Sequence, residues 1–188
     1  MRTSRLHAML VAVIGVACSD STTAPVTTWT ATITVANETP APTGTSTLGG
    51  TASVMLTGGG TGTGTLTYSV TLTGAPTSTI TAMHIHGGTA TAGAAGTAGP
   101  VRVNLCGAST MTTDNRNSAT WPTCPAGAGS IPSTTVTWPL GSTSVGGTGL
   151  TFDQLVSAVR AFNTYANVHT TTNGGGEARG QLIVPAAP

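Results

Sequence analysis

The chain has 188 residues, 38% of them hydrophobic and only 6% charged, and its formal net charge is +1. The charged fraction lies far below the roughly 25% of ordinary globular domains, and so small a net charge offers no basic surface for DNA or RNA. The length suits one domain with a leader and a tail. Abundant threonine, a β-branched residue, together with 26 Gly and 11 Pro as turn formers, predicts an all-β fold.

Residues 1–17 have the organisation of a signal peptide. Arg2 and Arg5 supply a positive start, and the apolar stretch after them, residues 8–17, is too short to cross a bilayer as a stable helix. We therefore expect export of the chain to an extracytoplasmic location.

Cys18 follows this leader and resembles the cysteine of a bacterial lipoprotein signal, which is acylated and becomes the first residue of the mature protein. Ala17 is usual before such a cysteine, whereas Gly15 stands where a leucine-like residue is common. Residues 18–28 are polar and suit a flexible tether between a lipid anchor and a domain. We expect a cell-envelope protein held at the membrane by its lipid; if Cys18 is not acylated, the alternative is a secreted protein.

Two cysteines remain once Cys18 is set aside, namely Cys106 and Cys124. In an oxidising compartment we expect them to form a disulfide. Closing a loop of this length stabilises a fold by about 3 kcal/mol in the chain-entropy model. A cysteine metal site is disfavoured because the sequence has no CxxC spacing.

Alternating hydrophobic residues mark a series of short strands. They are predicted over residues 29–36, 51–57, 65–74, 80–86 and 100–107. A further strand over residues 131–142 is predicted to lie at a sheet edge, because Pro139 cannot donate to a central ladder.

One helix is predicted, over residues 150–162, where hydrophobic side chains recur at helical spacing. Thr151 and Gln154 are placed for a capping box at its start. Residues 165–184 predict a β-hairpin that turns at an Asn-Gly loop. Together the elements predict an antiparallel, Greek-key-like β-sandwich with one short helix near the C-terminus.

Three parts of the chain are similar to the CHRD domain, a family named for chordin and found in many exported bacterial proteins. They are residues 36–56, the block MHIHGG with GPVRVNL (residues 83–88 and 99–105), and YANVHTTTNGGGEARGQL (residues 165–182), which is the most specific. The chain departs from the family pattern in the loop NGGGE, which often contains a proline, and at Thr39, where valine is common.

The resemblance covers residues 29–184, which we assign to the domain, with residues 185–188 as a tail. It implies an extracytoplasmic β-sandwich related to the copper/zinc superoxide dismutase fold. Because chordin is an extracellular growth-factor antagonist, the resemblance also implies a non-enzymatic binding module for an extracellular protein or a small ligand.

His84 and His86 are candidate metal ligands on the strand predicted over residues 80–86. Residues two apart on a strand share a face, and their Cα atoms lie roughly 7 Å apart, which suits two ligands of one transition metal. We expect Met83 and Ile85 to face the core and the two histidines to point away from it.

The closing hairpin supplies further polar groups. We take Asn167 to pair with Arg179 across the hairpin. His169 then lies opposite Glu177, and Gln181 shares their face. The candidate ligands for copper or zinc are His84, His86, His169 and Glu177, with Asn167, Arg179 and Gln181 as supporting polar groups.

Two interpretations of these residues stay open at this point. They bind a metal, or they form a structural polar network that fixes the hairpin. Superoxide dismutase activity is not expected, because only three histidines follow the leader. The sequence has no phosphate loop, no G-x-S-x-G elbow and no clear pair of glycosidase carboxylates, so no catalytic residue is assigned.

Overall fold

A computed structural model of the protein describes residues 27–88, 93–107, 122–138 and 151–184. The strands are β1 (Thr27–Thr34), β2 (Gly49–Gly58), β3 (Gly64–Thr73), β4 (Ile80–Gly87), β5 (Val101–Gly107), β6 (Gly129–Trp138), β7 (Thr164–Thr170) and β8 (Ala178–Gln181). The helices are the 3-10 helix η1 (Val35–Asn37) and the α-helix α1 (Phe152–Arg160). The prediction of an all-β fold with one short helix is confirmed, and the predicted leader, Cys18 and the tail lie outside the described residues.

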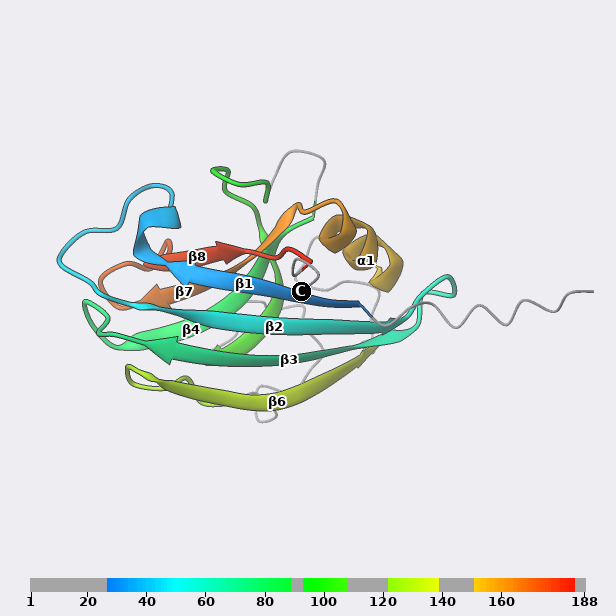
Figure 1. Ribbon diagram of the computed structural model, residues 1–188, viewed down its shortest axis with the longest axis horizontal. Coiled ribbons are helices and arrows are strands. Elements are labelled where there is room, and N and C mark those ends of the chain that lie inside the picture. The colour runs from blue at the N-terminus through cyan, green and yellow to red at the C-terminus, as the bar shows by residue number, and fades with distance from the viewer. Residues whose placement is uncertain (1–26, 89–92, 108–121, 139–150, 185–188) are drawn as a thin grey trace, which may run out of the picture.

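The eight strands form one sheet, in the order β5-β4-β7-β8-β1-β2-β3-β6. The sheet curls so that β1, β2 and β3 lie in front of the green strands β4 and β5 in Figure 1, which gives it a sandwich-like, nearly closed shape. The front half of the sheet contains β3 and the rear half contains β5. Tyr68 on β3 connects these two halves across the interior, because its hydroxyl donates to the carbonyl oxygen of Leu105 on β5 at 2.7 Å. The strand predicted for a sheet edge is β6, which does end the sheet, while Pro139 lies outside the described residues.

The core lies between these two halves and is built by strand alternation. On β3 the buried residues are Leu66, Tyr68, Val70 and Leu72, as the pattern predicts. Helix α1 closes one end and buries Phe152, whose ring lies where a Cβ on Gly64 would stand. The predicted capping box is present, because Thr151 and Gln154 each accept a hydrogen bond from the backbone N–H of the other.

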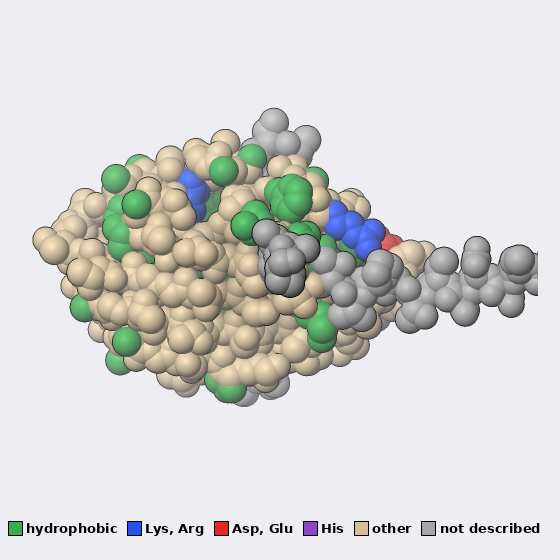
Figure 2. Space-filling view, viewed as in Figure 1, with side chains coloured by type: hydrophobic (Ala, Val, Ile, Leu, Met, Phe, Trp, Pro, Cys, Tyr) green, Lys and Arg blue, Asp and Glu red, His purple; other side chains and the backbone are tan. Residues whose placement is uncertain are grey.

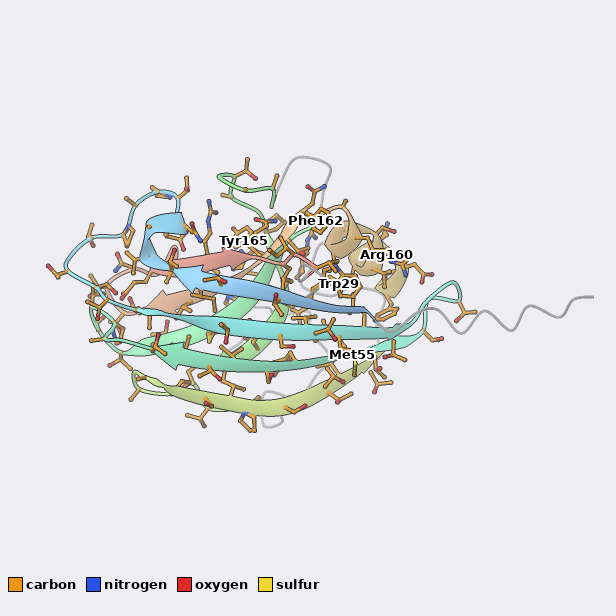
Figure 3. The ribbon with its side chains drawn as sticks, in the orientation of Figure 1. Trp29, Met55, Arg160, Phe162 and Tyr165 are labelled. Atoms are coloured by element: carbon orange, nitrogen blue, oxygen red, sulfur yellow. A yellow bond between two sulfur atoms is a disulfide. The ribbon has the colours of Figure 1, made fainter. Side chains whose placement is uncertain are left out.

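The outer face of β1, β2 and β3 carries hydroxyl side chains and almost no charge. Alternate residues point outward here, among them Thr30, Thr32, Thr51, Ser53, Ser69 and Thr71. Figure 2 shows this face as a broad uncharged surface. Met55, which Figure 3 labels, is a hydrophobic side chain on β2 among these hydroxyl-bearing residues. The face explains how a chain with so few charges keeps a polar surface.

The predicted disulfide is confirmed between Cys106, which is buried on β5, and Cys124. It ties the segment before β6 to β5, an edge strand of the sheet.

Strands β7 and β8 form a hairpin, whose register pairs Asn167 with Arg179 as predicted. Strand β4 pairs with the other side of β7 and sets His84 opposite Asn167. These pairings decide which polar side chains meet.

Candidate metal centre

The pairing of β4 with β7 brings three histidines together. His169 lies opposite Ala82, so it shares a face with His84 and His86. Their ring centroids are 4.7 Å apart for His84 and His169, 5.2 Å for His86 and His169, and 5.5 Å for His84 and His86. One ring nitrogen from each lies within 4.8 Å of the other two, which is close enough for all three to approach one ion.

The histidine side chains point away from the apolar core as predicted, but their face is also buried, which the sequence did not indicate. Strand parity itself holds, since Met83 and Ile85 face the apolar interior. The opposite face is covered as well, and the exposed fractions are only 4% for His84 and 7% each for His86 and His169. The cover consists of the loop segment 93–100, the hairpin loop and the stretch around η1, which all bond to side chains of this face.

Backbone carbonyls fix the protonation of two of the rings. The Nδ1 atom of His86 lies 2.8 Å from the carbonyl oxygen of Gly99, and the Nδ1 atom of His169 lies 3.0 Å from that of Gly174. A carbonyl oxygen can only accept, so both Nδ1 atoms carry the hydrogen and, in the neutral ring, both Nε2 atoms present a lone pair. These Nε2 atoms face each other at 3.1 Å. Two lone pairs at that distance repel unless a proton or a metal ion lies between them.

Burial disfavours the proton. Desolvation lowers the pKa of His84 to about 3, helped by the neighbouring His169 and His86. It likewise lowers the pKa of His86 to about 4, although the bond to Gly99 opposes the shift, and it lowers the pKa of His169. All three rings are therefore neutral bases at neutral pH, and the Nδ1 atom of His84 is buried without a hydrogen-bond partner.

Glu177 does not join the histidines. Strand β8 begins at Ala178, one residue after Glu177, and Val168 of β7 pairs with Ala178 while its carbonyl oxygen also accepts from the Glu177 backbone N–H at 2.7 Å. Glu177 therefore lies just outside the regular register, and its carboxylate turns to the loops instead of facing His169. Its oxygens accept hydrogen bonds from Ser46 Oγ at 2.7 Å, the Thr77 backbone N–H at 2.7 Å, Thr170 Oγ1 at 2.7 Å, Asn173 Nδ2 at 3.0 Å and the Thr77 hydroxyl. These bonds hold its pKa at about 2 despite burial.

Of the supporting residues predicted from the sequence, Asn167 on β7 pairs with His84, and Arg179 and Gln181 lie on β8, the next strand. Arg179 donates from Nε to the carbonyl oxygen of Asn37 at 2.7 Å and from Nη1 to that of Thr97 at 2.9 Å. The Gln181 amide donates to the carbonyl oxygens of Gly93 and Thr164, each at 2.8 Å. Asn167 is 1% exposed, and its Oδ1 atom has no hydrogen-bond partner.

Sequence reasoning missed Tyr165 as part of the site, although strand parity already placed it on the histidine face. Its ring stacks on His86 with centroids 5.2 Å apart and an interplanar angle of 15°. The guanidinium carbon of Arg179 lies 4.8 Å from the centroid of the same ring (Figure 3 labels Tyr165). Tyr165 therefore contacts both a fixed cation and a candidate ligand.

No helix in the described parts of the chain is long and apolar enough to cross a membrane.

Comparison with known proteins gives one result. No curated protein and no solved structure shows significant similarity to the chain. The family model of the CHRD domain matches residues 29–182, which include every residue of the histidine cluster. The match spans most of the sequence, and the chain belongs to the CHRD domain family.

Proposed function

We propose that this CHRD domain is a non-enzymatic binding module of the bacterial cell envelope and that its ligand is a transition-metal ion, copper or zinc, held by His84, His86 and His169. One observation carries the proposal. The bonds to Gly99 and Gly174 fix two rings so that both free Nε2 lone pairs point at the same place. Histidines that bind metals commonly donate their other ring N–H to a backbone carbonyl in this way.

The spacing of the nitrogens supports the same proposal. A tetrahedral ion with ligands at about 2.0–2.1 Å separates its ligand nitrogens by about 3.3–3.4 Å. The Nε2 atoms of His86 and His169 are already 3.1 Å apart. One ring nitrogen of His84 lies within 4.8 Å of the ligand nitrogens of the other two rings, so all three can approach one ion. A bound ion would also give a polar partner to the buried His84 ring, whose Nδ1 atom has no hydrogen-bond partner.

A purely structural network explains these contacts less well. A hydrogen bond between His86 and His169 requires one ring to be charged in a buried place, and His84 contributes no bond through Nδ1. A buried polar network normally satisfies each of its members. The three rings behave instead as ligands held ready for an ion.

Metal loading tests the proposal. Protein stripped with chelator and reloaded with copper or zinc is expected to hold one ion per chain by elemental analysis, because the three rings converge on one point. The His86→Ala, His169→Ala double variant is expected to hold none. Arg160→Ala is the matched control, since Arg160 is exposed on α1 away from the site (Figure 3) and should bind as the unaltered protein does. Equal loading of the double variant, or no loading of the unaltered protein, would refute the proposal.

Location in the envelope rests on the leader and on Cys18. A disulfide, as found between Cys106 and Cys124, is typical of proteins in oxidising compartments. With Cys18→Ser, lipid labelling in cells is expected to disappear and the protein to leave the membrane fraction, because the acyl chain has lost its attachment point. Ser19→Ala keeps the cysteine and should be labelled normally. Persistent labelling of the Cys18→Ser protein would mean that no lipid is attached there.

A further inference from the structure

We infer that the three-histidine site selects monovalent copper, Cu(I), over divalent zinc and divalent copper. The inference rests on the proposed function, and it adds the charge of the ion that the site accepts. It follows from three features: the ligands carry no charge, fixed cations lie next to them, and the site is buried.

The ligand set is neutral. In the described part of the chain no carboxylate or thiol joins the three nitrogens within 4.8 Å. Glu177 accepts bonds from four other residues, and Asp153 accepts from the backbone N–H groups of Gly60 and Gly62. Glu38 accepts from the backbone N–H of Thr39 and acts electrostatically on Arg179, so it offsets part of that arginine's charge, but its carboxylate does not join the three nitrogens. A divalent ion held by three imidazoles would thus keep its full double charge.

Two arginines add positive charge beside this site. Arg179 lies over one face of the Tyr165 ring, and His86 stacks on Tyr165 as well. Arg102 is buried on β5, and its Nε atom donates to the carbonyl oxygen of Gly87, next to His86 in the chain. Both guanidinium groups act electrostatically on His86. Arginine stays protonated in proteins, so both oppose the entry of a cation, and they oppose a divalent one twice as strongly.

Burial makes the charge of the ion decisive. The cost of moving an ion from water into a poorly polarisable interior grows with the square of its charge, so a divalent ion loses about four times as much hydration as a monovalent ion of similar size. Charged or coordinating groups must offset that loss, and here the histidines bring no negative charge. Structural zinc sites also commonly take four ligands. Cu(I) accepts lower coordination numbers and imidazole nitrogen, so the three rings suffice.

Competition titrations with the full chain test this selectivity. Cu(I) is titrated without oxygen against a chromophoric Cu(I) chelator, and zinc is titrated against a zinc chelator. We expect the dissociation constant for Cu(I) to lie well below that for zinc. Zinc binding as tight as Cu(I) binding, or tighter, would overturn the inference while leaving the proposed function intact. If neither ion binds, the proposed function itself fails.

A charge series isolates the cause. Arg179→Gln removes one positive charge without removing a ligand, and is expected to narrow the preference for Cu(I) over zinc on the order of tenfold. Arg179→Lys keeps the charge and should keep the preference. Arg102→Gln and Arg102→Lys repeat the comparison at a second position, so the test survives if one arginine is needed for folding. Equal preferences in the glutamine and lysine variants would contradict the electrostatic explanation.

Discussion

Replacing Glu177 with glutamine is expected to lower the free energy of unfolding by about 3 kcal/mol at neutral pH. The carboxylate is fully buried and accepts hydrogen bonds from Ser46, Thr77, Thr170 and Asn173. These residues come from separate parts of the chain, so one side chain ties the loops before β2 and β4 to the β7–β8 hairpin. The magnitude follows from the shift of its pKa from 4.5 to about 2, since one pKa unit corresponds to about 1.4 kcal/mol.

The same shift fixes the direction of the pH dependence. The folded pKa of Glu177 lies below its ordinary value, because hydrogen bonds to the ionised form outweigh the desolvation that would raise it. Its contribution to stability is therefore complete above the ordinary pKa of 4.5 and is lost as the pH falls toward 2. Urea unfolding between pH 2 and 7 is expected to show this decline in the unaltered protein and a flatter profile in Glu177→Gln.

Asp153→Asn is the matched control for Glu177. Asp153 is only partly buried and accepts two backbone hydrogen bonds at the β2–β3 turn, from Gly60 at 2.6 Å and Gly62 at 3.0 Å. An amide oxygen can keep one of these bonds, so its replacement should cost about 1 kcal/mol. If Glu177→Gln destabilised the protein no more than Asp153→Asn does, the carboxylate would not be the structural tie that its contacts indicate.

The register of the closing hairpin was predictable, whereas the direction of the Glu177 side chain was not. Alternation of side chains along a strand is a local rule, and it gave the pairing of Asn167 with Arg179 correctly. The rule holds only while the two strands keep a regular register. Gly176 has a φ of +135°, and the strand resumes at Ala178, so Glu177 lies just outside the region where alternation applies. Two of its partners, Ser46 and Thr77, come from loops 131 and 100 residues earlier in the chain, which no local pattern reveals.

The hydrophobic pattern of the sequence also could not predict that the histidine face is buried. Segment 93–100 has no large hydrophobic anchor, yet it covers the site through direct contact of backbones. A Cβ on Gly93 would lie 2.2 Å from the carbonyl oxygen of Asn163, and one on Gly99 would lie 2.7 Å from the Cα atom of Gly87. Only glycine lets these segments approach so closely. The carbonyl of Gly99 is thereby placed on His86, so a loop that reads as featureless positions a candidate ligand.

Replacing His84 with leucine is expected to stabilise the metal-free protein by about 1–2 kcal/mol, since it removes a buried polar atom that has no partner. The same change should abolish most of the stabilisation that metal gives. A ligand present at a thousand times its dissociation constant stabilises a folded protein by about 4 kcal/mol, and loss of one of three ligands weakens that binding. Thermal unfolding with and without Cu(I) measures both effects in one experiment.

The two interpretations of the histidines predict opposite signs for this substitution. If the rings formed a structural network, His84→Leu would destabilise the metal-free protein, because every member of such a network is satisfied by another. His86→Leu provides the comparison: it leaves the Gly99 carbonyl without its donor and removes the stack on Tyr165, so it should destabilise the metal-free protein under either interpretation. A gain in stability for His84→Leu and a loss for His86→Leu would show that His84 destabilises the metal-free protein, as expected of a residue that is there to bind an ion. A loss in both would leave the structural network as the better explanation.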